Sequence, residues 1–138
     1  MKKDFMFTSE SVTEGHPDKI CDQISDAVLD HFLEQDPYAR VRAECAISTS
    51  ILFIAARFAS EVKADIPTLA RKVISRIGYR RPDFDAQTCS VLTSLQEYHH
   101  SADLYFNESN LDDEEIEKIP VRQQATVFGF ACRQTDVL

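Results

Sequence analysis

The sequence is poor in the residues that mark low-complexity, disulfide-rich or membrane-spanning chains. Its 138 residues include 3 glycines, 5 prolines and no tryptophan, while 43% are hydrophobic and 28% are charged. The longest apolar run, 51–56, is far shorter than the roughly 20 residues that a transmembrane helix needs. The two lysines near the start are not followed by the apolar segment of a secretory signal. We therefore expect one folded domain of ordinary size, in the cytoplasm and not in a membrane.

An excess of basic residues and a compact cysteine cluster are also lacking. The formal net charge is −8, which argues against nucleic-acid binding through general electrostatic attraction. The 4 cysteines form no C-x-x-C pair and no compact group with histidine, which disfavours a zinc site. Without a signal segment, we expect reduced thiols that pack mostly as small hydrophobic side chains.

Hydrophobic periodicity predicts two helices. Apolar residues recur at helical spacing over 17–34, where Pro17 suits the first helical position because its missing N–H would have no partner there. A second stripe runs over 66–77. Asp65 stands before it as a candidate N-cap, and Gly78 follows it where a left-handed residue commonly ends a helix.

Alternating hydrophobicity predicts three strands. Residues 40–48 and 88–95 alternate with a period of two, whereas 51–59 are apolar on both faces except at Arg57, which favours a central strand. The short segment 48–50 favours an antiparallel hairpin between the first two strands. The order helix–strand–strand–helix–strand predicts an α+β fold, with two helices on one face of a small, mostly antiparallel sheet.

The periodic pattern fades after this third strand. We expect a folded domain over 1–96, then a polar, acidic connection over 97–125. Within it, the acidic run 112–117 is typical of a solvated loop or an exposed helical turn. Residues 126–132 favour another strand, so 126–138 is interpreted as the start of a further segment that is cut short.

A histidine, a carboxylate and an amine occur close together where the first helix begins. They are His16, Asp18 and Lys19. A helix N-terminus attracts anions, a carboxylate can hold Mg²⁺ against a polyphosphate, and a histidine can donate a proton to an oxygen that gains charge. The alternative is structural, with His16 as a cap and Asp18 as a partner of the helix dipole.

The stretch Phe7–Asp30 closely resembles the N-terminal segment of S-adenosylmethionine synthetases (methionine adenosyltransferases). The resemblance continues in patches through Glu34–Pro37, Ile77–Tyr79 and Phe128–Ala131. It implies a fold like one repeat of that family's fold. It also implies a transferase in which the methionine sulfur attacks C5′ of ATP, with Mg²⁺ and K⁺ assisting, and whose triphosphate product is cleaved to phosphate and diphosphate.

The resemblance also implies roles for individual residues. His16 matches the catalytic histidine near the leaving triphosphate oxygen, and Lys19 lies with it at the ATP site. Asp18 matches a Mg²⁺ ligand, Glu44 matches the K⁺-site glutamate, and Glu10 matches a glutamate near the nucleotide and metals.

Other positions depart from the family pattern. Arg57 stands where the family has the glutamate that holds the methionine ammonium, so a cation replaces an anion. His100 stands near the family's methionine-contacting glutamine, and Gln123 replaces the aspartate of a glycine-rich loop. For Glu44, the alternative to a K⁺ ligand is an exposed strand carboxylate paired with Arg42.

We therefore expect the N-terminal domain of a divergent S-adenosylmethionine synthetase, inactive as this chain alone because most of the family's phosphate- and metal-binding residues lie beyond it. The alternative is a non-catalytic nucleotide-binding, metal-binding or regulatory module that associates with a full-length synthetase. Because the family's active sites lie between two subunits, we also expect a homodimer or a synthetase partner subunit.

Overall fold

Helices and strands make up most of the part of the chain that the computed structural model describes, namely residues 6, 8, 10–82, 84–98, 108–119, 126, 127, 129, 131, 133 and 136. In chain order they are α1 (Pro17–Leu33), β1 (Arg40–Ser48), β2 (Ile51–Ala59), α2 (Ile66–Ile77), β3 (Arg80–Arg81), β4 (Phe84–Asp85), β5 (Ser90–Glu97), the 3₁₀ turn η1 (Glu108–Asn110) and α3 (Asp113–Glu117). The chain divides into two units, Met1–Phe106 and Asn107–Leu138.

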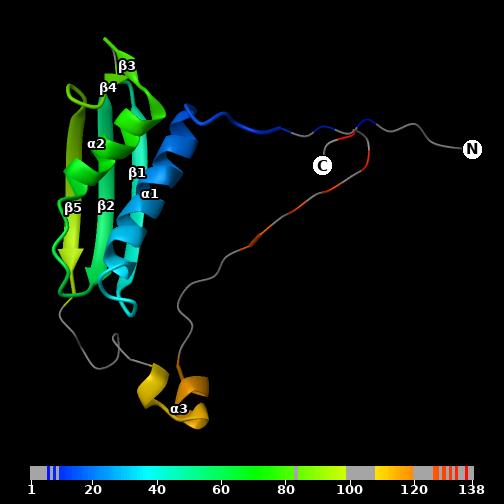
Figure 1. Cartoon of the computed structure of the whole chain (residues 1–138), viewed down its shortest axis with the longest axis vertical. Helices are drawn as coiled ribbons and strands as arrows, with labels where there is room; N and C mark the ends of the chain where they lie inside the picture. Colours follow the sequence, from blue (N-terminus) through cyan, green and yellow to red (C-terminus); the bar gives the residue numbers. More distant parts are fainter. Residues whose placement is uncertain are drawn as a thin grey trace, which may run out of the picture. The chain divides into compact units, whose positions relative to one another are not determined.

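The first unit contains a sheet with the strand order β1-β2-β5 (Figure 1). β1 and β2 form the expected antiparallel hairpin, closed by the pair Ser48 and Ile51, and β2 is central as predicted. β5 pairs with β2 in parallel, with Ser90 opposite Ile51, because the chain crosses over through α2 before it returns to the sheet. The small antiparallel pair β3–β4 lies between α2 and β5, where the sequence predicted no strand.

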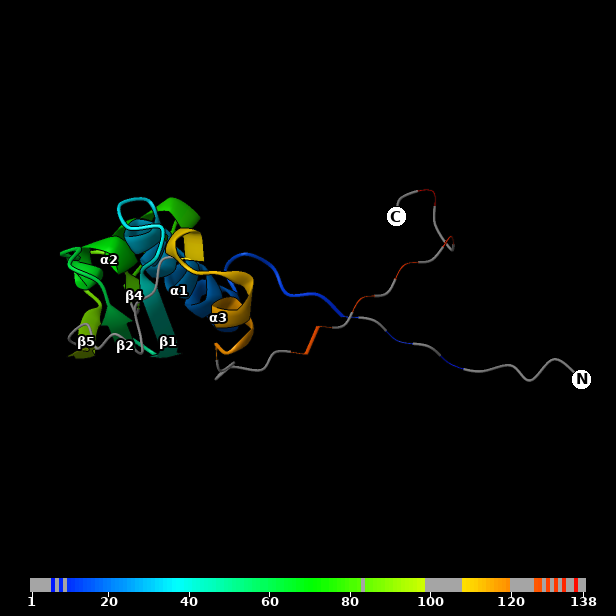
Figure 2. The same cartoon turned by 90° about the horizontal axis from the view of Figure 1, so that it is seen from below.

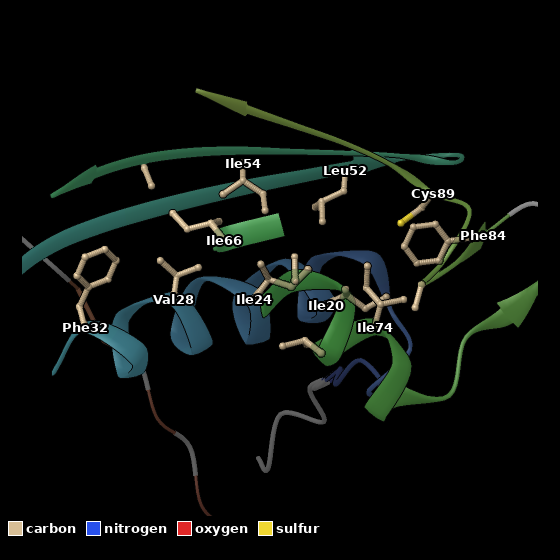
Figure 3. Packing of buried hydrophobic residues seen from close by; sticks show 14 residues of the cluster. Ile20, Ile24, Val28, Phe32, Leu52, Ile54, Ile66, Ile74, Phe84 and Cys89 are labelled. Atoms are coloured by element: carbon tan, nitrogen blue, oxygen red, sulfur yellow. The ribbon is translucent and has the colours of Figure 1, made fainter. Parts of the chain in front are cut away.

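Both long helices cover the same face of this sheet, which confirms the expected α+β arrangement (Figure 2). The apolar stripe of each helix meets the inward side chains of β2, and the β4–β5 region closes one end (Figure 3). Burying these side chains removes apolar surface from water and stabilises the fold. The buried core consists of Ile20, Ile24, Val28, Phe32, Leu52, Ile54, Ala56, Ile66, Ala70, Val73, Ile74, Phe84, Ala86 and Cys89.

The helix ends follow the signals in the sequence. α1 begins at Pro17, with His16 as its N-cap. At α2, the Asp65 carboxylate accepts hydrogen bonds from the Thr68 backbone N–H at 3.1 Å and from the Thr68 hydroxyl at 2.6 Å. These bonds stabilise the charged form and hold the pKa of Asp65 below its usual value. Gly78 ends α2 in the left-handed region, at φ 98°.

The opposite face of the sheet has no helix over it within the described part of this unit. Along it, side chains alternate with those of the core, so Ile51, Phe53 and Leu92 are 46%, 43% and 54% exposed. Charged and polar side chains occupy the other half of the same face, at Arg42 and Arg57 among others. In the ranges that the structure describes, no helix has both the length and the apolar character to cross a membrane.

The second unit contains the acidic run, which forms the helical turn α3 and is exposed, in agreement with one of the two expected forms. Asp112 caps it, because its carboxylate accepts from the Glu115 backbone N–H while the Glu115 side chain accepts from that of Asp112. His100 and Gln123 lie outside the described residues. The strand expected over 126–132 lies largely outside them. The domain limits drawn at 96 and 125 stay predictions.

Candidate functional site

The start of α1 brings His16 and Asp18 together. The Asp18 backbone N–H donates to Nδ1 of His16 at 3.2 Å, and the Asp18 carboxylate lies 3.8 Å from the same nitrogen. Because Nδ1 accepts, the neutral imidazole carries its proton on Nε2, which remains available as a donor. The two side chains are 42% and 89% exposed, so both are open to a ligand. His16 therefore serves as a cap, and its second nitrogen has no partner among the residues that the structure describes.

The backbone just before His16 is held by a residue distant in the sequence. The Tyr79 hydroxyl donates to the Gly15 carbonyl, and the Tyr79 ring packs edge-on against Phe84 with centroids 5.1 Å apart. The His16 backbone N–H closes a turn by donating to the Thr13 carbonyl at 3.0 Å. No role was predicted for Tyr79 from the sequence, although it belongs to one of the patches that resemble the family.

The electrostatic setting of this helix start suits a phosphorylated ligand. The dipole of α1 favours negative charge, and Lys19 adds a formal positive charge. In the first turn only the Lys19 N–H has no partner among the described residues, because Pro17 has no N–H and those of Asp18 and Ile20 donate to His16. The Asp18 carboxylate makes no other described contact, and one carboxylate together with phosphate oxygens and water is a usual ligand set for Mg²⁺. Asp18 therefore fits a Mg²⁺ ligand. Glu10 is exposed, and no contact among the described residues joins it to His16.

Glu44 lies elsewhere, on the open face of β1, whereas α1 packs on the other face. Arg42 donates to one Glu44 oxygen through Nε at 2.8 Å and Nη2 at 2.5 Å, which is the pairing considered as the alternative. A potassium ion at Glu44 would have to compete with this exposed guanidinium, and the role of Glu44 as a K⁺ ligand stays a prediction. Among the described residues, no group of three or more histidine, cysteine, aspartate and glutamate side chains could hold a metal.

Arg57 lies on the same open face, directly opposite Arg42 in the β1–β2 pairing. Its guanidinium carbon is 5.8 Å from the centre of the Tyr98 ring, a cation–π distance. A hollow of about 400 Å³ lies beside it, lined by Arg42, Glu44, Ala55, Ala56, Arg57, Ser94 and Gln96. The position that departs most clearly from the family pattern therefore adjoins a concave surface.

A larger hollow, of about 660 Å³, lies at the other end of α1, around Pro37 and Val62. Its polar groups bond to one another: the Ser60 hydroxyl donates to Asp36 at 2.7 Å and accepts from the Val62 backbone N–H at 3.2 Å. These bonds hold the chain after α1 against the chain after β2. The polar groups of this hollow therefore have a structural role in the fold.

The described cysteines are poor candidates for nucleophiles. Cys21, Cys45 and Cys89 are free thiols. Burial, with the neighbouring Cys45 as a second cause, raises the pKa of Cys21 to about 11, and burial also raises the pKa of Cys45. Cys21 and Cys45 therefore carry little thiolate near neutral pH and act as small packing groups, while Cys89 is buried in the core, as expected from the sequence.

The fold and the helix start together define a two-layer α+β domain with an open, anion-attracting site at a helix N-terminus. The chain matches the family model described as S-adenosylmethionine synthetase, N-terminal domain, over residues 4–100. The chain therefore belongs to the S-adenosylmethionine synthetase family, which confirms the resemblance. The family consists of transferases that generally use Mg²⁺ and K⁺.

Proposed function

We propose that this chain is the N-terminal domain of a divergent S-adenosylmethionine synthetase, which converts ATP and L-methionine to S-adenosylmethionine, phosphate and diphosphate. The observation that carries the proposal is the start of α1, where His16 offers an Nε2 donor, unpartnered among the described residues, beside the exposed carboxylate of Asp18. The family match supports the assignment to this reaction.

Each group at the helix start has a chemical task in this reaction. The Nε2 proton of His16 stabilises the triphosphate oxygen that gains negative charge as the methionine sulfur displaces it from C5′. The Lys19 ammonium and backbone N–H, together with the dipole of α1, attract and orient the phosphates. Asp18 would hold Mg²⁺, which neutralises phosphate charge when it is bound.

The chain by itself is proposed to be inactive and to need further subunits or sequence. A complex with another synthetase subunit would supply groups that a second copy of this chain cannot, while a homodimer would agree with the family's placement of active sites between two subunits. Arg57 faces Arg42 and leaves no anion for a substrate ammonium, because Glu44 is already paired with Arg42. This arrangement favours a second candidate function, a non-catalytic nucleotide-binding or regulatory module that associates with a full-length synthetase.

The helix-start site is tested by calorimetry with ATP and Mg²⁺. Asp18→Asn removes one negative charge without a change of size, so we expect it to weaken Mg²⁺-dependent ATP binding by about tenfold, the effect of one charged contact. Asp26→Asn makes the same change on an exposed position of α1 and should leave binding unchanged.

The outcomes separate the roles. Equal binding by the Asp18→Asn variant and the wild type would show that Asp18 is only a partner of the helix dipole. If neither binds, the site is incomplete in the isolated chain. In that case, a change in the turnover of a full-length synthetase after mixing with this chain would support the regulatory module.

A further inference from the structure

The open face of the sheet carries its side chains in rows that cross the three strands. Three consecutive rows contain Arg42, Arg57 and Gln96; then Glu44, Ala55 and Ser94; then Ala46, Phe53 and Leu92. In the middle row, Ala55 and Ser94 have short side chains, whereas the rows on either side of them carry long ones. This difference in size explains why a hollow of about 400 Å³ forms at this place.

Beside the hollow, one positive charge has no acidic partner among the residues that the structure describes. Arg42 and Arg57 are directly opposite each other, an arrangement of like charges that destabilises a sheet. Glu44 neutralises Arg42, to which it is bonded. No carboxylate of the described residues lies within ion-pair distance of Arg57, so none of them accepts a hydrogen bond from its guanidinium group. The fold thus keeps an unfavourable charge beside a concave surface.

Arg57 is also held in place by its neighbours. Its guanidinium lies 5.8 Å from the centre of the Tyr98 ring, and the Tyr98 hydroxyl donates to the Gln96 side chain at 3.2 Å. A guanidinium that stacks on an aromatic ring loses less freedom when it binds an acid. Its planar set of N–H donors matches the two oxygens of a carboxylate.

We propose that this hollow binds a small molecule with a carboxylate head and a short apolar tail. Arg57 holds the carboxylate, with Ser94 and Gln96 as further polar partners in the same hollow. The tail lies over Ala55 toward Phe53, which is exposed and offers apolar surface. Because the Arg42–Glu44 pair is neutral, Arg57 supplies the one net positive charge among the described residues of the lining, which matches a monocarboxylate better than a doubly charged phosphate. The proposal does not depend on nucleotide binding at α1.

The test is a nuclear magnetic resonance titration of the full ¹⁵N-labelled chain with hexanoate. We expect saturable shifts of the backbone amide signals in β2 and β5 around Ala55 and Ser94. Hexylammonium, which has the same tail length and the opposite charge, should cause no such shifts. Inorganic phosphate should bind at least tenfold more weakly than hexanoate.

Two matched variants locate the effect. Arg57→Gln keeps the length and polarity of the side chain but removes the charge, so it should weaken hexanoate binding by about ten- to a hundredfold. Arg76→Gln makes the same change in the last turn of α2, away from the open face, and should leave binding unchanged. Both positions are exposed, so folding should be retained.

Several outcomes would overturn the proposal. These are no saturable shift with hexanoate, equal binding by the Arg57→Gln variant, equal shifts with hexylammonium, or phosphate binding as tight as that of hexanoate. Titration of the same samples with ATP and Mg²⁺ reports on α1 separately. Loss of nucleotide binding with hexanoate binding intact would contradict only the proposed function, and the reverse would contradict only this inference.

Discussion

Tyr79 is a residue whose importance becomes visible only in the folded chain. Its hydroxyl reaches the Gly15 carbonyl across the fold, so it connects the end of α2 to the residue before His16. Without this bond, the segment that enters α1 would have one less contact to fix its path. The precision of the helix start therefore depends on a residue outside it.

Replacing Tyr79 by phenylalanine should show this dependence. The variant keeps the ring contact with Phe84 but removes the donor, so we expect the free energy of unfolding to fall by about 1 kcal/mol. Urea denaturation measures the change, and ¹⁵N relaxation should show greater motion at Gly15 and His16. Tyr98→Phe removes an exposed hydroxyl and is the control; an equal loss in both variants would contradict the role of Tyr79.

At the level of single residues, the sequence predicted proximity only where it is local. His16 and Asp18 are two positions apart at a helix start, so their contact follows from the cap signal. The pair of Arg42 and Glu44 was one of two stated alternatives for the same reason: both lie on one face of a strand. The bond from Tyr79 to Gly15 was not predicted, because no local sequence pattern indicates that the end of α2 lies next to the start of α1.

Among the elements, α2 has the clearest signals at both ends. Its N-terminus is capped by Asp65, whose carboxylate accepts two bonds from Thr68, and its C-terminus ends at Gly78 in the left-handed conformation. The cap bonds favour the charged carboxylate and lower its pKa. This helix must stay in place because it carries the chain from β2 to β5.

The cap should make stability depend on pH. A carboxylate with a lowered pKa in the folded state stabilises the protein above its unfolded pKa of about 3.9, and the contribution is lost as pH falls through the folded value. Asp65→Asn keeps an acceptor but does not titrate. We expect the stability difference between wild type and variant to be constant above about pH 5 and to shrink below about pH 4. Urea denaturation across this range tests it; a difference independent of pH would contradict the assignment.

The elements themselves were largely predictable. The spans of α1, α2, β1 and β2 follow from hydrophobic periods that the sequence displays directly. The β3–β4 pair was missed because two-residue strands are too short to show a period. The parallel direction of β5 was not specified either, since alternation marks a strand without giving its direction.

For the molecule as a whole, the proposed function treats the site residues of this chain as one part of a larger catalytic centre. We expect no S-adenosylmethionine formation above background from the chain alone, because catalysis depends on many groups held in position together. The measurement is product formation with ATP, methionine, Mg²⁺ and K⁺. Steady turnover that follows the chain through purification would disprove this expectation.

The parallel pairing of β5 with β2 has a consequence for how the sheet opens. The β1–β2 hairpin joins neighbouring segments, whereas β5 can pair only after α2 has crossed the sheet, which costs more chain entropy. β5 should therefore be the last strand to join and the first to separate. Hydrogen exchange under native conditions should show faster exchange for amides bonded between β2 and β5 than for those between β1 and β2. The reverse order would mean that the crossover forms early and holds the sheet together.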